Sequence, residues 1–228
     1  MPFHDRTDAG RQLARRVAHL RGADVVVLGL PRGGVPVAYE VAAALEAPLD
    51  VILVRKVRVP GRPELAMGAV GEGDVVVCND RVQRLARVGA EEFAAAADRE
   101  REELERRARR VRDARPRLPL AGRTVLVVDD GIATGATARA AGAVVRAQGA
   151  ARVVLAAPVC APDAATTLAA SVDELVCLEI PRGFVAVGQA YTHFRPTAEQ
   201  TVLDLLRRAA GDRPAPAPGG TVPRGGDP

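Results

Sequence analysis

The stretch Val125-Leu126-Val127-Val128-Asp129-Asp130-Gly131-Ile132-Ala133-Thr134-Gly135-Ala136-Thr137 decides the fold of this chain. Four apolar β-forming residues run directly into two carboxylates. A loop of glycine and threonine follows, and residues 138–148 have an alanine-rich helical pattern. A continuous apolar run is typical of a buried parallel strand, and α/β sheets bind ligands at the carboxyl ends of such strands. The pattern therefore predicts an α/β fold with a binding site at this junction.

The loop after the predicted strand has the composition of an anion site. Gly131 and Gly135 allow tight turns, so that successive N–H groups can converge on one anion at the start of a helix. Asp129 and Asp130 would repel that anion, but they suit hydroxyl groups or a cation beside it. Together these groups indicate a phosphorylated sugar. In the alternative interpretation the segment is an ordinary strand–turn–helix junction with an aspartate as the helix N-cap.

These thirteen residues resemble the 5-phosphoribosyl-1-pyrophosphate (PRPP) loop of the type I phosphoribosyltransferases. The resemblance implies a twisted, mostly parallel five-stranded sheet flanked by helices, with a small hood made from the chain termini. It implies that Asp129 and Asp130 hold the ribose hydroxyls, directly or through Mg²⁺, which is the predicted cofactor. The 5-phosphate would be bound by the loop residues Gly131, Ile132, Ala133, Thr134, Gly135, Ala136 and Thr137.

A second glycine loop, Pro31-Arg32-Gly33-Gly34, lies between a predicted strand at 25–30 and a predicted helix at 35–45. Taken alone, it could be a simple tight turn. Placed before the first loop, it resembles the family's pyrophosphate loop, which often carries a non-proline cis peptide.

Arg55 and Lys56 end the next predicted strand, at 49–54, and extend the pyrophosphate site that the resemblance implies. Lys56 is the only lysine beside 31 arginines, and its position resembles that of the lysine that contacts pyrophosphate in orotate-type relatives. The alternative is a surface lysine at the end of a strand.

Residues 58–74 contain four glycines and two prolines, which predicts a long, mobile loop. Its position resembles that of the family's flexible catalytic loop, which closes over PRPP and excludes water. Arg58 and Arg62 would then add positive charge near the leaving group. Glu64 and Glu72 either contact the acceptor or face solvent.

The segment 184–194 gathers three of the six aromatic residues of the chain. Phe184, Tyr191 and Phe194 either stack on an acceptor base or fill the core. His193 is either an acid–base group or structural.

One position of the PRPP loop departs from a known type. Hypoxanthine–guanine-type enzymes place an aspartate where this chain has Ala133, so no loop carboxylate can help the acceptor lose its proton. Residues 30–34 and 184–194 most resemble a bacterial subgroup of predicted phosphoribosyltransferases whose acceptor is unassigned. The acceptor is therefore left open.

The rest of the chain reads as one domain, residues 1–210, with a helical insert at about 82–115. Residues 211–228 are rich in proline and glycine and are predicted to be disordered. The charged helix at 82–112 is interpreted as a solvated face, with a contact in a homodimer as the alternative. Further helices are predicted at 8–21, 162–170 and 197–209, and further strands at 75–78, 153–159 and 175–178.

Composition narrows the function classes. The 228 residues are 48% hydrophobic and 26% charged, and the apolar runs are too short to span a membrane. Three cysteines without metal-ligand spacing and a start without a secretory pattern predict a cytoplasmic protein. The net charge of +4 comes with few aromatic residues, which argues against nucleic acid as a partner.

The sequence thus predicts an enzyme: a Mg²⁺-dependent phosphoribosyltransferase, a pentosyltransferase of nucleotide metabolism. It would displace pyrophosphate from PRPP with a nucleobase or another nitrogenous acceptor. The alternative is a PRPP-binding sensor or regulator that has no turnover. A nucleic-acid-binding regulator on the same fold is allowed by the basic isoelectric point and supported by nothing else.

Overall fold

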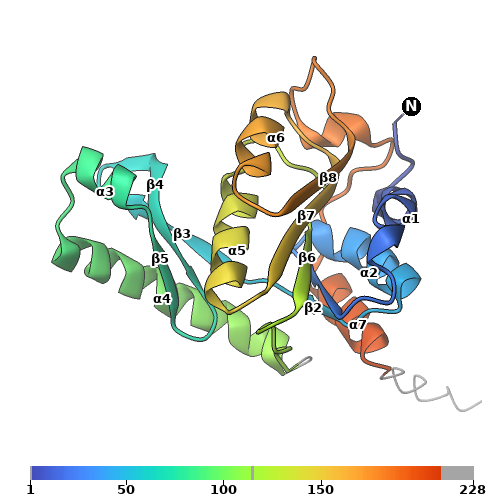
Figure 1. The fold of residues 1–228 in the computed structure, drawn as a ribbon, viewed down its shortest axis with the longest axis horizontal. Helices are drawn as coiled ribbons and strands as arrows, with labels where there is room; N and C mark the ends of the chain where they lie inside the picture. Colours follow the sequence, from blue (N-terminus) through green and yellow to red (C-terminus); the bar gives the residue numbers. More distant parts are fainter. Residues whose placement is uncertain (1, 114–115, 212–228) are drawn as a thin grey trace, which may run out of the picture.

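The computed structural model describes residues 2–113 and 116–211. Its centre is a five-stranded sheet in which every neighbouring pair is parallel, so the predicted α/β class is confirmed (Figure 1). The strands, in spatial order, are β2 (Leu49–Val51), β1 (Val25–Gly29), β6 (Thr124–Val128), β7 (Arg152–Val159) and β8 (Glu174–Glu179). β1 and β6 are almost completely buried, which explains their unbroken apolar sequences.

Helices cover both faces of this sheet. On one face lie α1 (Arg6–Arg16), α2 (Gly34–Leu45) and α7 (Glu199–Ala209), and on the other lie α5 (Ala136–Ala147) and α6 (Pro162–Ala169). Successive residues of a strand point to opposite faces, so Val25 and Val27 pack in the first layer and Val26 and Leu28 in the second. The helices predicted at 35–45, 138–148, 162–170 and 197–209 are confirmed within a few residues at each end.

The N-terminal helix is shorter than predicted. It ends at Arg16 and is followed by a short 3₁₀ helix, Ala18–Leu20, and its N-cap is Asp5, whose side chain accepts from the Asp8 N–H. Phe3, two residues before this cap, pairs with Tyr191, which follows a second 3₁₀ helix, Val187–Ala190. These two segments, one from the start of the described chain and one from shortly before α7, pack together and form the small hood.

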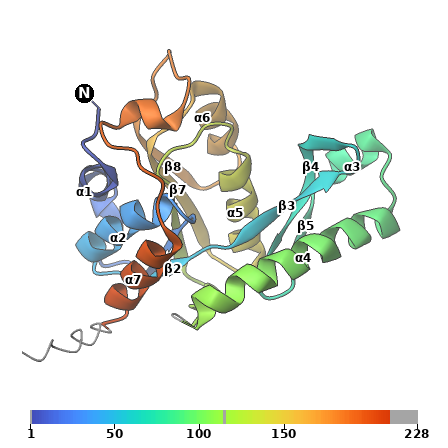
Figure 2. The ribbon, with the colours of Figure 1, turned by 180° about the vertical axis from the view of Figure 1, so that it is seen from behind.

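A second sheet extends away from the first (Figures 1 and 2). It is antiparallel and consists of β3 (Val54–Val59), β4 (Arg62–Gly71) and β5 (Val75–Cys78). Two helices complete this unit, α3 (Asp80–Ala86) and the long α4 (Ala90–Arg112). We call residues 54–112 the arm.

The prediction of a long loop at 58–74 was wrong, because most of this segment belongs to β3 and β4. Only Pro60 and Gly61 form the turn between them. Gly68 and Gly71 lie inside β4 because neighbouring groups come very close. A Cβ at Gly68 would lie 2.8 Å from the Phe93 ring, and one at Gly71 would lie 2.2 Å from Val144. These glycines make room for packing rather than for turns.

Two other boundaries also differ from the prediction. The strand predicted at 49–54 is divided between the two sheets, because β2 ends at Val51 and β3 begins at Val54. Arg55 and Lys56 therefore lie inside β3 and not at the end of a strand. The helix predicted at 82–112 is interrupted after α3, where Arg87 has a left-handed backbone with φ of 55°.

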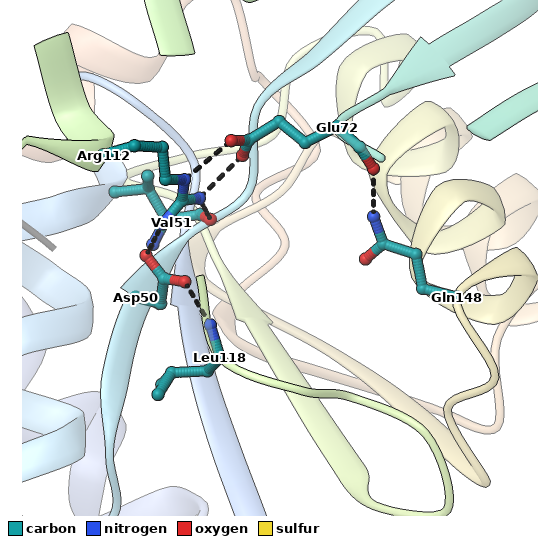
Figure 3. Close-up of polar contacts among 6 residues, drawn as sticks. All are labelled: Asp50, Val51, Glu72, Arg112, Leu118 and Gln148. Carbon is teal, nitrogen blue, oxygen red and sulfur yellow. Dashed lines mark hydrogen bonds and ion pairs between the residues drawn. The ribbon is translucent and has the colours of Figure 1, made fainter. Parts of the chain in front are cut away.

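A buried ionic cluster joins the arm to the central sheet (Figure 3). Arg112 donates from Nε and Nη2 to the two carboxylate oxygens of Glu72, each at 2.6 Å, and from Nη1 to Asp50 at 2.7 Å. Asp50 also accepts from the Leu118 N–H, and Gln148, just after α5, donates to the Glu72 carbonyl. Burial raises the pKa of Asp50 despite the opposing effect of Arg112. Glu72 thus neither faces solvent nor reaches an acceptor.

Residues 212–228, most of the tail predicted to be disordered, lie outside the described residues. Among the residues that are described, no helix combines the length and the apolar character needed to cross a membrane.

Candidate functional site

The two predicted loops meet at the carboxyl edge of the parallel sheet. β1 and β6 are neighbours, with Gly29 opposite Val128, so the loops that follow them start side by side. A Cβ at Gly33 would lie 2.0 Å from Asp130 Oδ2, and one at Gly34 would lie 2.5 Å from the Val128 carbonyl. Only glycine fits this approach. The peptide between Pro31 and Arg32 is cis, as the resemblance implied.

The loop 131–137 is anchored at one side and open at the other. The Ile132 N–H donates to the Val159 carbonyl at 2.9 Å, and the Ile132 carbonyl accepts from Ala161 at 2.8 Å. Gly135 has a φ of +70° and is the N-cap of α5. The N–H groups of Ala133, Thr134 and Gly135 have no acceptor within the described part of the chain. A row of free N–H groups at a helix N-terminus is suited to an anion.

The two aspartates after β6 have different surroundings. Asp129 is half-buried and forms no ion pair within residues 2–113 and 116–211; it accepts the Asp130 N–H at 2.9 Å. Burial and the neighbouring charge of Asp130 raise the pKa of Asp129 to about 8. Asp130, by contrast, is paired with Arg6, whose Nε and Nη2 lie 2.8 and 2.7 Å from Oδ2.

Arg6 is a site residue that sequence reasoning missed. It is the first residue of α1, and it also donates to the Arg195 carbonyl at 2.7 Å. Its guanidinium lies 4.1 Å from the ring centroid of Phe194. Arg6 and Asp130 are 124 positions apart, and nothing local distinguishes this arginine from the many others. Only the threading of the N-terminus past the sheet edge brings it here.

The structure brings together two of the three predicted acceptor aromatics. Tyr191 and Phe194 stack with ring centroids 5.1 Å apart, and Tyr191 donates its hydroxyl to the Asp130 carbonyl at 2.5 Å. Tyr191 is buried, and burial raises the pKa of its phenol. Phe184 has no ring contact within the described residues. His193 is exposed and lies edge-on to His4.

The predicted pyrophosphate residues divide between two clefts. Arg55 and Lys56 are successive residues of β3, so their side chains point to opposite faces. Arg55 lines a cleft together with Pro31 and Arg32. Lys56 lines a different cleft, between the arm and α5, where Arg139 also lies. The Lys56 side chain therefore lines a different cleft from the one that Arg55 shares with Pro31 and Arg32.

The residues predicted for a flexible catalytic loop belong to the β3–β4 hairpin, whose turn lies at the outer end of the arm (Figure 2). Arg58 lies 3.9 Å from Glu100 of α4. Arg62 and Glu64 are exposed and have no ion pair within the described chain.

Asp129 and Asp130 are the predicted metal-binding residues. Within the described residues, no group of three or more His, Cys, Asp or Glu side chains could hold a metal ion. A cation at Asp129 and Asp130 would need further oxygen ligands from a bound molecule.

Residues 5–193 match the model of the family described as phosphoribosyl transferase domain. This range includes both glycine loops, the two aspartates and the whole arm. The chain belongs to the phosphoribosyl transferase family.

Particular relatives agree with this assignment. The crystal structure of TT1426 from Thermus thermophilus has 46% sequence identity and a TM-score of 0.86, over 91% of this chain and 99% of that one. Proteins of two Mycobacterium tuberculosis strains, CDC 1551 and H37Rv, both named "Putative phosphoribosyl transferase", are 55% identical over 210 residues. The match covers 92% of this chain and 47% of theirs, so the chain spans about half the length of these relatives.

Proposed function

We propose that this chain is a Mg²⁺-dependent transferase that displaces pyrophosphate from PRPP with a nitrogenous acceptor. The observation that carries the proposal is the contact between the two loops. The close approach of Gly33 to Asp130 places a loop suited to one anion beside carboxylates suited to hydroxyls. The free N–H groups at 133–135 supply a second anion site at the start of α5.

In this proposal the N–H groups of Ala133, Thr134 and Gly135, with the Thr134 and Thr137 hydroxyls, hold the 5-phosphate. Asp129 and Asp130 accept hydrogen bonds from the ribose hydroxyls. Arg32 and the backbone of Gly33 and Gly34 bind the pyrophosphate, and Arg55 adds charge from β3. Lys56 and Arg139 face the other cleft, so we assign them no contact with pyrophosphate.

The residues present fit a magnesium ion carried mainly by the substrate. Asp129 is a half-buried carboxylate beside a second carboxylate, with an elevated pKa, and it has no cation of its own among the described residues. A cation there would remove the repulsion between the two aspartates. When bound, Mg²⁺ would neutralise the oxygens of pyrophosphate as it departs.

The reaction breaks the bond between ribose C1 and the pyrophosphate oxygen and forms a bond from C1 to the acceptor nitrogen, with inversion. Positive charge develops on the ribose ring in the transition state, so the site's main contribution is electrostatic. The fixed dipoles of the 133–135 loop and the charge of Arg32 hold both ends of the substrate. Ala133 offers no carboxylate, so the acceptor's proton must leave to another group or to water.

One observation favours the alternative, a PRPP-binding sensor. The ion pair from Arg6 occupies the Asp130 carboxylate that the ribose hydroxyls would use. Catalysis requires PRPP either to displace Arg6 from Asp130 or to bind Asp130 while Arg6 remains in contact with it. A sensor could couple the same displacement to movement of the N-terminal segment.

The test measures binding and turnover separately. PRPP with Mg²⁺ should raise the melting temperature, and the double variant Asp129→Asn/Asp130→Asn should abolish that rise. Pyrophosphate release is then screened with a panel of nucleobases and other nitrogen acceptors. Release with one acceptor supports the transferase, and binding without release from any acceptor supports the sensor. An unchanged melting shift in the double variant would refute the assignment of the site.

A further inference from the structure

The cleft that Arg55 shares with Pro31 and Arg32 is lined largely by arginine. It lies between the C-terminal half of α4, α7 and the loop after β1, where Figure 2 shows α4 approaching α7. Its volume is about 490 Å³. Five arginines and two glutamates provide its charge: Arg32, Arg55, Arg106, Arg107, Arg110, Glu103 and Glu199.

Two of these arginines have no carboxylate partner in the part of the chain that the structure describes. Arg55 is paired with Glu100, Arg106 with Glu103, and Arg110 with Glu199 across the α4–α7 gap. Arg32 and Arg107 form no ion pair or side-chain hydrogen bond within the described residues. They belong to opposite walls of the cleft, one to the pyrophosphate loop and one to α4. The positive charge of these two side chains is therefore available to a bound anion.

The cleft suits an extended anion better than a single small one. Arg106, Arg107 and Arg110 fall within five residues of one helix, and the rise from Arg106 to Arg110 is about 6 Å, which is long enough to meet several phosphate groups in line. Leu53, Val111 and Val202 supply an apolar lining. A low-dielectric wall strengthens the attraction between guanidinium groups and phosphates.

The described lining contains no Phe, Tyr or Trp, so a nucleobase would find no aromatic surface to stack on. This composition favours a polyphosphate chain without a base over a nucleotide. Guanidinium groups also form paired hydrogen bonds with phosphate oxygens, which lysine does not do.

We propose that this arginine cleft binds a linear polyphosphate anion of three or more phosphates. The site is distinct from the 5-phosphate loop, but it shares Arg32 and Arg55 with the predicted pyrophosphate site. Occupancy of the cleft therefore competes with PRPP for these two arginines. That competition rests on the proposed function, whereas the binding of the anion does not.

Titration calorimetry with sodium tripolyphosphate tests the proposal on the full chain at low salt. The expected result is one site per chain whose affinity falls steeply as salt is added. Arg107→Gln should weaken binding about tenfold or more, a loss of about 1.4 kcal/mol or more. Because Arg107 has no ion pair to lose within the described residues, the fold should be unaffected.

Arg109→Gln is the matched control. Arg109 lies two positions further along α4, is exposed and lines a different cleft, and the substitution removes the same charge. It should change the affinity less than twofold. Equal losses in the two variants would overturn the proposal, because they would indicate diffuse attraction to a basic helix. No binding of tripolyphosphate would overturn it as well.

Two further binding measurements identify the ligand class and separate the arginine cleft from the proposed PRPP site. ATP should bind no more tightly than tripolyphosphate, and a tenfold preference for ATP would refute the assignment to a chain without a base. Asp129→Asn/Asp130→Asn should leave tripolyphosphate binding intact. If PRPP fails to bind while tripolyphosphate binds through Arg107, the proposed function fails and this inference stands.

Discussion

The sheet-edge loops and the arm use glycine for the same physical purpose, yet only the first could be interpreted from sequence. Gly33 lets the loop after β1 touch Asp130, and Gly71 lets β4 touch Val144 of α5. In the first case the glycines adjoin charged and hydroxyl residues within one contiguous motif. In the second they lie among alanine and valine and resemble turn signals. The site is specified locally, whereas the arm is specified by contacts between distant segments.

The largest expected loss of stability is at the junction between the arm and the central sheet, where Arg112 pairs with Glu72 and Asp50. Arg112→Met should destabilise the protein by about 3–5 kcal/mol, because two buried carboxylates would lose their shared cation. Urea denaturation followed by circular dichroism measures the loss.

Arg109→Met, on the same helix but exposed, should change stability by no more than about 0.5 kcal/mol. A small loss for Arg112→Met would show that the arm is held by α4 packing alone. The ionic cluster would then be incidental.

The second prediction concerns Gly71. Gly71→Ala places a methyl group 2.2 Å from Val144 Cγ1, so α5 or β4 must shift. We expect a loss of about 1–3 kcal/mol in the free energy of unfolding. Gly183→Ala is the control, since a Cβ there meets nothing within 4 Å. Equal stability of the two variants would mean that α5 or β4 shifts without cost and that this close approach does not require glycine.

The parallel sheet was predictable because each of its main strands is a contiguous apolar run followed by a turn signal. β1, β6 and β7 were placed within a residue or two from such runs. In the arm, β5 and the helical segment after it were also predicted, but the β3–β4 hairpin was not, because many of the apolar side chains in β4 are small, as at Ala66 and Ala69. Ala69 is buried in the cluster that includes α5, a contact that no local pattern reveals.

The candidate site divides in the same way. The positions of Asp129, Asp130 and the glycine loops followed from local patterns, and the structure brings these elements together. Arg6 could not be found, since its role depends on the path of the N-terminus. The separation of Arg55 from Lys56 follows from strand alternation, and it would have been predictable had β3 been recognised as continuing through these residues.

The third prediction concerns the repulsion between the two aspartates. Burial and Asp130 raise the pKa of Asp129 to about 8, so its ionisation opposes folding. This cost is absent below about pH 4, the ordinary range of an aspartate, and grows as pH rises to about 8. Asp129→Asn should therefore stabilise the free protein by about 1–2 kcal/mol at pH 8. The gain is smaller than the full pKa shift would give, because Asp129 is partly exposed and solvent screens its charge.

The measurement for Asp129→Asn is the melting temperature of both proteins without ligand, from pH 5 to pH 8. The gap between variant and wild type should widen as pH rises. A gap that is constant with pH would contradict the electrostatic explanation. A variant that gains stability but loses a ligand-binding carboxylate shows the usual trade-off between stability and function.

The smallest predicted effect concerns Tyr191, where the hood meets the sheet edge. Tyr191→Phe keeps the stacked ring and removes only the hydroxyl that donates to the Asp130 carbonyl. The loss of this one hydrogen bond should lower the free energy of unfolding by about 1 kcal/mol. Because Tyr191 is buried and in contact with Phe3 and Phe194, the apparent affinity for an acceptor should not change. A large rise in the acceptor KM with unchanged stability would instead place the phenol in the acceptor pocket, as the sequence first suggested.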